Sequence, residues 1–189
     1  TVGADCSVGK MYTSLAIDAE LRARGRKSSF RATGQTGILI TGEGVPLDAV
    51  VADFISGAIE TLTPPNDPDH WDVVEGQGSL LHPSFAGVTI GLIHGAQPDA
   101  LVLCHEPTRT HMRGLPHYPV ATIEAAMEAS LAAARLTNPA ARFVGVSVNT
   151  RALDAAAAHR RLHEIAARTG LPTVDPIRTG VGPIVDALD

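Results

Sequence analysis

The stretch Gly3-Ala4-Asp5-Cys6-Ser7-Val8-Gly9-Lys10 decides the fold, because it fits the pattern GxxxxGK and a helical pattern follows it directly. Small residues let backbone N–H groups curl around phosphate oxygens, and the lysine adds a positive charge. The following helix would aim the positive end of its dipole at the same anion. The alternative is an ordinary turn with a solvated lysine. The preferred interpretation is a phosphate-binding loop whose cofactor contacts are Gly3, Asp5, Cys6, Ser7, Val8, Gly9, Lys10 and Met11.

The residue after the lysine departs from the full pattern. Loops that hold nucleoside triphosphates place a serine or threonine there, whose hydroxyl binds Mg²⁺, whereas this chain has Met11. The next aliphatic hydroxyls, on Thr13 and Ser14, point elsewhere on the expected helix. The departure weakens an ATP-hydrolysing interpretation and leaves open a site that holds a pyrophosphate without splitting it, as a coenzyme A or dinucleotide site would.

Cys6 lies inside the loop, close to a helix N-terminus that would favour its thiolate. An acyl-cysteine intermediate is one interpretation, and a small residue packed under the loop is the favoured one. The other cysteine is Cys104, and no CxxC spacing occurs. We therefore expect neither a disulfide framework nor a zinc–thiolate site. We do expect a reducing, cytoplasmic location.

Helical and extended patterns alternate along the rest of the chain. Helical patterns cover 13–24, 47–62, 88–94, 123–134 and 153–168, and extended or apolar runs cover 28–32, 71–74, 100–104, 143–148 and 173–174. Continuous apolar runs such as 100–104 are typical of strands covered on both faces. The alternation predicts one α/β domain over 1–189: a mostly parallel sheet with helices on both faces, a P-loop NTPase-like three-layer sandwich.

Charge and composition exclude some classes of binding partner. The net charge of the 189 residues is -5, which does not attract nucleic acid or anionic membranes. No apolar run approaches the roughly 20 residues that span a bilayer. We therefore expect a small-molecule substrate, no nucleic acid and no membrane. Ala-rich helix faces leave room for a homo-oligomer, which we also expect.

The phosphate-loop pattern normally follows a strand of about five residues. Only Thr1 and Val2 precede the pattern here. We therefore expect that an N-terminal portion, up to a whole domain, is missing from this chain.

Ligands of parallel α/β sheets bind beyond the carboxyl ends of the strands, so the residues after each run are the candidates. Glu75 follows one strand and would act as a base, or as a ligand if Mg²⁺ is used; otherwise no metal ligand is expected. Polar residues nearby would contact the substrate; the alternative for all of them is plain turn chemistry. These substrate contacts are Thr33, Gln35, Thr36, Gln77 and Ser79.

Two further strand ends carry candidate residues. After 100–104, His105 would serve as a catalytic base, and Arg109 would clamp a carboxylate or phosphate of the substrate. After 143–148, Asn149 would read a base edge of the cofactor or cap the next helix. The chain has eight histidines, but they show neither HxH nor HExxH spacing, so the pattern predicts no metal site.

Four blocks in this order make the chain resemble a known family: GADCSVGKM, ATGQTGILITGEG, VEGQGSLLHPSFAGVTIGLIHGAQPD and VLCHEPTR. They are similar to the phosphate-loop domain of a bacterial family long catalogued as a domain of unknown function. Its members carry the label D-glutamate N-acetyltransferase or an older label of NAD(P)-dependent oxidoreductase. The dense resemblance runs from Gly3 to about Arg109. Family loops commonly have threonine two residues after the lysine, where this chain has Tyr12.

The resemblance implies acetyl transfer from acetyl-CoA to the amine of an acidic D-amino acid such as D-glutamate. It also implies a Rossmann-like N-terminal domain as a partner within the same protein. The chain is more distantly similar to dethiobiotin synthetase, whose VEGAGG segment compares with 74–78 and which implies ATP- and Mg²⁺-dependent ligation of a carboxylate. A non-catalytic nucleotide-binding module is the third hypothesis.

Overall fold

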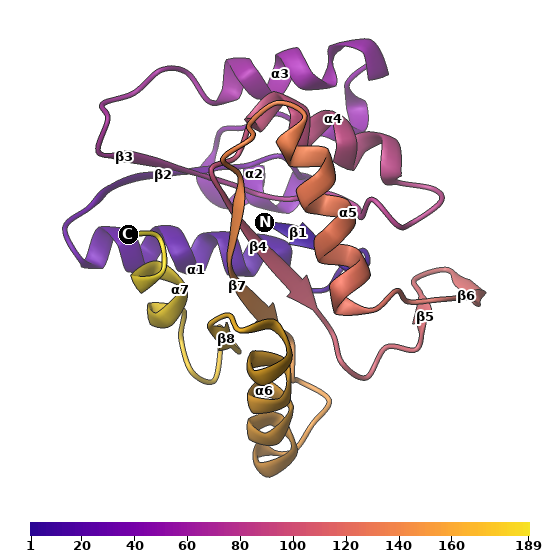
Figure 1. Ribbon diagram of the computed structural model, residues 1–189. Coiled ribbons are helices and arrows are strands. Elements are labelled where there is room, and N and C mark those ends of the chain that lie inside the picture. The colour runs from indigo at the N-terminus through magenta and orange to yellow at the C-terminus, as the bar shows by residue number, and fades with distance from the viewer.

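The computed structural model describes residues 1–189 as a layer of parallel strands between two layers of helices (Figure 1). The strands are β1 (Val2–Gly3), β2 (Lys27–Arg31), β3 (His70–Val74), β4 (Ala100–His105), β5 (His111–Met112), β6 (Leu115–Pro119), β7 (Arg142–Val148) and β8 (Thr173–Val174). The α-helices are α1 (Lys10–Ala23), α2 (Gln35–Thr41), α3 (Ile55–Leu62), α4 (Ala86–Ala96), α5 (Ile123–Arg135), α6 (Ala155–Thr169) and α7 (Gly182–Asp186). The predicted α/β class with helices on both faces is confirmed.

The parallel strands form two groups. One has the order β1-β4-β7-β8, and the other pairs β2 with β3. Val2 of β1 lies opposite Leu103 of β4, while on its other side the Thr1 nitrogen donates to the Val74 carbonyl of β3 at 3.1 Å. The short β1 therefore stands between the two groups, and the phosphate loop follows it directly.

Two apolar clusters pack on opposite sides of the strands. Helices α1 and α7 supply Ile17, Leu21 and Ile184 to the first cluster. Helices α4, α5 and α6 cover the other side, where Ile93 and Ile165 belong to the second. Helix α3 packs outside α4. None of these helices combines the length and apolar character that a bilayer crossing requires.

Two predicted segments differ from the structure. The predicted helix over 47–62 is broken, with 3-10 turns at Leu47–Ala49 and Ala52–Phe54 before α3 begins. Val50 and Val51 between the turns are extended, a conformation that suits β-branched residues. The apolar residues 38–40 lie within α2, although the sequence suggested only an apolar run beside a loop.

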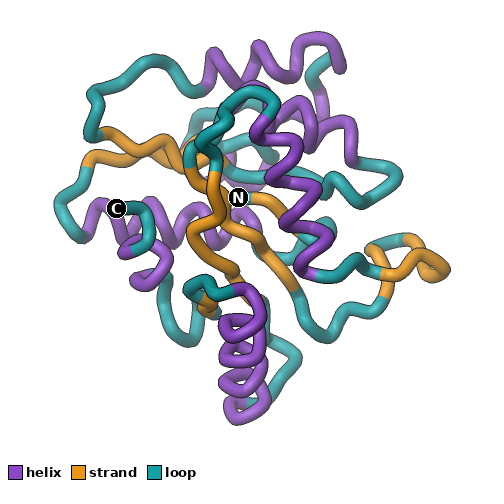
Figure 2. Tube along the Cα trace, viewed as in Figure 1, coloured by secondary structure: helices purple, strands orange, loops and turns teal.

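The hairpin of β5 and β6 and the helix α7 were not predicted. The hairpin is antiparallel and projects beyond the carboxyl end of β4 (Figure 2). Its strands are too short to carry a recognisable alternation of polar and apolar residues. This hairpin matters for the site because Arg113 lies in its turn.

Candidate active site

The Gly3–Lys10 loop has the geometry of an anion cradle. Ser7 and Gly9 have φ values of 53° and 110°, in the left-handed region that glycine adopts without strain. This path leaves the amides of Val8, Gly9 and Lys10 without hydrogen-bond acceptors inside the chain. The Lys10 ammonium lies under the loop, 6% exposed, and donates to the Asp5 carbonyl at 3.0 Å. Burial lowers the pKa of Lys10, and a bound anion would offset this effect.

Buried Asp5 braces the loop from behind. One carboxylate oxygen accepts the Cys6 amide at 2.6 Å, and the other accepts the Arg109 guanidinium at 2.8 Å and the Arg113 amide at 2.9 Å. Burial alone would raise the pKa of Asp5, but these hydrogen bonds outweigh it and lower the pKa below its ordinary value. Arg109 also donates to the Cys6 carbonyl at 2.5 Å. The ionised Asp5 therefore joins the phosphate loop to the segment that leads into the hairpin.

Glu75 fastens the ends of β2 and β3 together. Its Oε2 accepts the amides of Thr33 at 2.9 Å and Gly34 at 3.1 Å, and the Thr33 hydroxyl returns a bond to the Glu75 carbonyl at 2.6 Å. Oε1 accepts no hydrogen bond from the chain. Gly37 in α2 packs so closely that a Cβ there would collide with Oε2. The side chain is 4% exposed and borders the cleft described below.

A third carboxylate holds the end of β7. Asp175 accepts the Thr150 amide at 3.1 Å and the Thr150 hydroxyl through Oδ2, and the Ile177 amide at 2.9 Å through Oδ1. Burial would raise the pKa of Asp175, but the hydrogen bonds lower it. The hydrogen bonds between Asp175 and Thr150 fix the backbone next to Asn149, and Asn149 lines the same cleft as the loop.

These strand ends enclose one cleft of about 710 Å³. Of the predicted site residues, ten line it: Cys6, Ser7, Gly9, Lys10, Met11, Gln35, Thr36, Glu75, Gln77 and Asn149. Thus the loop, the β2 end, the β3 end and the β7 end face one space, as the rule for carboxyl ends of parallel strands expects.

The other predicted residues do not line the cleft. Gly3, Asp5 and Val8 are buried within the loop, and Thr33 and Ser79 are buried after the ends of β2 and β3. Arg109, expected to clamp a substrate, is engaged with the loop itself, and its second nitrogen pairs with Glu106.

His105 also lies outside the cleft lining. Its Nδ1 is buried without a hydrogen-bond partner, and burial lowers its pKa, as does nearby Arg161. Both effects favour the neutral imidazole.

Five side chains of the cleft were missed: Tyr12, Asp48, Phe85, Val88 and Arg113. Tyr12 and Phe85 are 46% and 45% exposed, so two aromatic rings stand open at this surface. The Arg113 side chain is exposed and makes no hydrogen bond or ion pair within the chain. Its place depends on the unpredicted hairpin, so only the topology brings it to the cleft.

Three residues that could together bind a metal ion are instead engaged in hydrogen bonds within the chain. Asp5, Cys6 and His82 place ligand-type atoms within 4.8 Å of one another. Both Asp5 oxygens are engaged, as described above. His82 accepts the Ser84 amide at 3.1 Å and contacts the Arg113 carbonyl at 3.0 Å. Burial raises the pKa of the Cys6 thiol, so the expected thiolate at the helix N-terminus is not favoured.

Comparison with known proteins agrees with this geometry. The family described as "DUF1611: Domain of unknown function (DUF1611_C) P-loop domain" matches residues 1–185. A crystal structure of a DUF1611 family protein from Anabaena variabilis superposes with a TM-score of 0.92 at 39% identity, over 99% of this chain and 55% of that one.

Two similar relatives are named D-glutamate N-acetyltransferase. The one from Tritonibacter scottomollicae is 64% identical over 187 residues, and the one from a Pseudoalteromonas species is 54% identical over 185 residues. The matches cover 99% and 98% of this chain, which spans 56% of the length of each relative. The chain therefore belongs to the DUF1611 family and forms its P-loop domain.

Proposed function

We propose that this domain is the coenzyme-binding part of an N-acetyltransferase that transfers an acetyl group from acetyl-CoA to the amine of an acidic amino acid such as D-glutamate. One observation carries the proposal: a single cleft brings the open amides of the phosphate loop and Lys10 together with Glu75. The names of the two relatives supply the reaction class.

The loop suits a pyrophosphate that is held and not cleaved. The amides of Val8, Gly9 and Lys10 would donate to its oxygens, and the Lys10 ammonium would neutralise part of its charge. Met11 occupies the position where Mg²⁺-dependent enzymes carry a hydroxyl. The exposed rings of Tyr12 and Phe85 offer apolar surface for the remainder of the coenzyme.

Glu75 is our candidate for the catalytic base. An ammonium group must lose a proton before its nitrogen can attack the thioester carbonyl. Oε2 is held by two amides, so Oε1 is the atom that would take this proton. The carbon–nitrogen bond then forms, the carbon–sulfur bond breaks, and the departing thiolate takes up the second proton that the nitrogen loses as it becomes an amide.

The start of α2 would support this step. The amides of Gln35 and Thr36 are in the first helical turn, where no intrahelical acceptor exists, and both residues line the cleft. They would stabilise the oxyanion that develops on the thioester carbonyl. Arg113 would bind a substrate carboxylate, the task that the sequence suggested for Arg109.

The runner-up is an ATP- and Mg²⁺-dependent ligase of the dethiobiotin synthetase kind, in which Glu75 would bind the metal. One assay of the whole protein separates the two. We expect free coenzyme A thiol to appear when acetyl-CoA and D-glutamate are mixed with the protein, at a rate indifferent to Mg²⁺. Turnover of ATP that needs Mg²⁺, with no thiol release, would contradict the proposal. Binding of acetyl-CoA without turnover would favour a nucleotide-sensing module instead.

The acceptor is tested in the same assay. Comparing the rate with L-glutamate to the rate with D-glutamate tests whether the enzyme selects the D stereoisomer. Comparing D-glutamine, which lacks the side-chain charge, tests whether it prefers an acidic side chain. Because Arg113 would supply a charge-assisted bond, Arg113→Met should reduce kcat/KM for D-glutamate about 10- to 100-fold. It should change the rate with D-glutamine much less. An equal loss with both acceptors would show that Arg113 does not recognise the side-chain carboxylate, because the two acceptors share the α-carboxylate.

A further inference from the structure

His82 is a buried side chain that packs against the candidate active site. It belongs to the segment between β3 and α4, and it is 1% exposed. Its ring packs against that of Phe85, with 4.7 Å between the two ring centroids, and Phe85 lines the cleft. His82 therefore lies behind one wall of the cleft, although no step of the proposed reaction uses it.

The partners of the two ring nitrogens determine which of them carries the proton. The Ser84 amide donates to Nδ1 at 3.1 Å, so this nitrogen is the acceptor of a neutral ring. Nε2 lies 3.0 Å from the Arg113 carbonyl, which can only accept a hydrogen bond. The proton is therefore on Nε2, and His82 donates to Arg113. A proton on Nδ1 would point at the Ser84 amide and break that bond.

Both polar groups of the Arg113 backbone are thus engaged. Its amide donates to Oδ2 of Asp5 at 2.9 Å, and its carbonyl accepts the proton of His82. A carboxylate oxygen of Asp5 and a ring nitrogen of His82 lie within 4.8 Å of each other. One buried pair of side chains therefore holds the residue whose own side chain reaches the cleft.

The rest of the β5–β6 hairpin has little contact with the fold, and Figure 2 shows it projecting from the molecule. Of residues 111–119, Met112 alone is buried. Apart from the ladder between β5 and β6, these residues form two hydrogen bonds to the chain outside 110–120, and both are at the Arg113 backbone. The position of the hairpin therefore depends on these two bonds and on the packing of Met112.

We propose that His82 is a positioning residue, whose Nε2–H anchors the β5–β6 hairpin and thereby holds the Arg113 guanidinium at the cleft for the side-chain carboxylate of the substrate. An exposed side chain without an ion pair recognises an anion well only when its backbone is held in place beforehand. The role given to Arg113 rests on the proposed function. The anchoring of the hairpin does not, and it is tested separately.

Two substitutions separate the two hydrogen bonds of the ring. The glutamine amide reaches about as far from the backbone as Nε2, so His82→Gln can still donate to the Arg113 carbonyl. The asparagine amide reaches only as far as Nδ1, so His82→Asn keeps an acceptor for Ser84 and loses the donor to Arg113. Both variants keep a polar side chain at a buried position and lose one bond each.

Kinetics of the whole protein test the effect on the substrate. We expect His82→Asn to reduce kcat/KM for D-glutamate about 3- to 10-fold, the loss that one hydrogen bond supports, and to change it much less for D-glutamine. His82→Gln should stay within about twofold of the unaltered protein. In an Arg113→Met background, His82→Asn should cause little further loss, because the side chain that it positions is gone. Equal losses with both acceptors, or the full additional loss in the double variant, would overturn the proposal.

Trypsin tests the anchor without any substrate. The Arg113–Gly114 bond lies in the exposed turn of the hairpin, and the Arg151–Ala152 bond lies in a second exposed turn that serves as the internal control. Cleavage follows local opening of the backbone. The whole protein with His82→Asn should therefore be cut at Arg113 about 3- to 10-fold faster than the unaltered protein, and at Arg151 at an unchanged rate.

The cleavage pattern also separates an anchor from a general structural role. The rate at Arg113 should return to nearly that of the unaltered protein in His82→Gln. Equal acceleration at both bonds would show a general loss of stability and would overturn the proposal, as would an unchanged rate at Arg113. Absence of acetyl transfer in the unaltered protein would contradict the proposed function, whereas the cleavage rates judge the anchor alone.

Discussion

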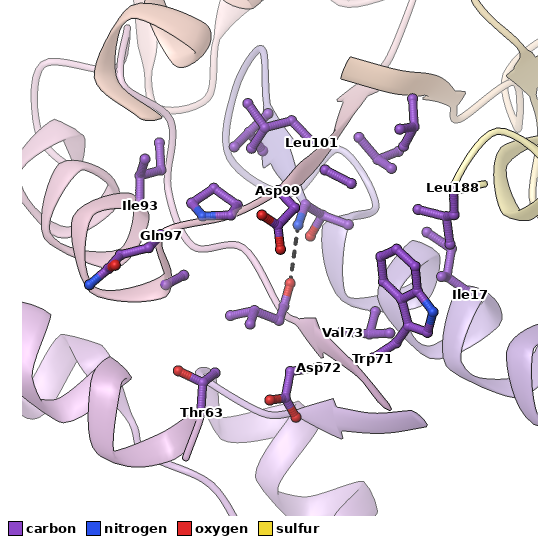
Figure 3. Close-up of a pocket in the computed structure, with 18 of the residues that line it drawn as sticks. Ile17, Thr63, Trp71, Asp72, Val73, Ile93, Gln97, Asp99, Leu101 and Leu188 are labelled. Carbon is purple, nitrogen blue, oxygen red and sulfur yellow. Dashed lines mark hydrogen bonds between the residues drawn. The ribbon is translucent and has the colours of Figure 1, made fainter. Parts of the chain in front are cut away.

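The two ends of the central strands are built on different principles. At the carboxyl ends of β1 and β3, the ionised Asp5 and the buried Glu75 hold the loops through hydrogen bonds to particular backbone amides. At the amino ends, a cavity between β3 and β4 is lined mainly by apolar side chains, among them Ile17 of α1 and Ile93 of α4 (Figure 3). Hydrogen-bond direction therefore fixes the candidate active site, whereas apolar packing shapes the amino ends of the strands.

The comparison teaches which changes each end tolerates. A hydrogen bond to a carboxylate fails abruptly when its acceptor is removed, because buried amides are left unpaired. Where packing is apolar, a substitution lowers the free energy of unfolding in proportion to the apolar area that it exposes to water. The predictions below ask how far the cleft depends on its carboxylates and on close backbone approach.

The largest effect is expected at Glu75. Glu75→Ala leaves the buried amides of Thr33 and Gly34 without their acceptor, which should lower the free energy of unfolding by about 2–4 kcal/mol. Glu75→Gln keeps one accepting oxygen and should cost less, about 1 kcal/mol, while reducing kcat about 10²–10⁴-fold if Oε1 is the base. Urea unfolding and steady-state rates measure the two quantities. Full activity of Glu75→Gln would leave Glu75 a structural clamp only.

The next effect concerns Asp5 and depends on pH. Asp5→Asn should lower the unfolding free energy at pH 7 by about 1.5–3 kcal/mol, because charge-assisted bonds are lost. The folded-state pKa of Asp5 is depressed, so its stabilisation is complete above the unfolded-state value near 3.9. It is lost as the pH falls through the folded-state value.

The difference between Asp5→Asn and the unaltered protein should therefore shrink below about pH 4. Urea unfolding at a series of pH values measures it. A difference that stays constant down to pH 3 would show that the hydrogen bonds to Arg109 and to the Arg113 amide do not depend on the charge of Asp5.

Two helical glycines should give smaller effects on stability, of opposite sign. Gly37 and Gly57 both lie in helices, but a Cβ at Gly37 would collide with Glu75, whereas nothing lies within 4 Å of one at Gly57. Gly37→Ala should destabilise the fold by about 1–3 kcal/mol through overpacking. Gly57→Ala should stabilise it by about 0.5–1 kcal/mol through helix propensity. Thermal unfolding of both variants measures the difference. Equal shifts in unfolding temperature would show that the close packing of Gly37 against Glu75 does not constrain residue 37.

The sequence predicted the parts of this molecule that depend on local pattern. The GxxxxGK spacing located the loop, and the polar residues after the apolar runs led to Glu75 and Asn149, which do face the cleft. Strand ends are predictable because the topology of a parallel sheet brings them together.

The remainder depended on contacts between distant segments. Arg109 and Arg113 are four residues apart in the same hydrophilic stretch, and no local pattern indicates that the first braces Asp5 while the second reaches the cleft. The break at Val50 and Val51 was not predicted, because a regular apolar spacing does not distinguish one helix from short turns joined by extended residues. The cavity between β3 and β4 was not predicted either, because residues from several elements that are distant in sequence line it.

The central claim is that the Gly3–Lys10 loop holds the phosphates of acetyl-CoA. Calorimetric titration of acetyl-CoA into the whole protein, Lys10→Met and Lys27→Met tests it most directly. Lys27 is the matched control, because it carries the same charge, is exposed, and pairs with Asp67 and Asp69 at the start of β2. We predict that Lys10→Met raises Kd roughly 10- to 150-fold, about 1.5–3 kcal/mol, and that Lys27→Met leaves it within about twofold. An unchanged Kd for Lys10→Met in a folded protein would contradict the account.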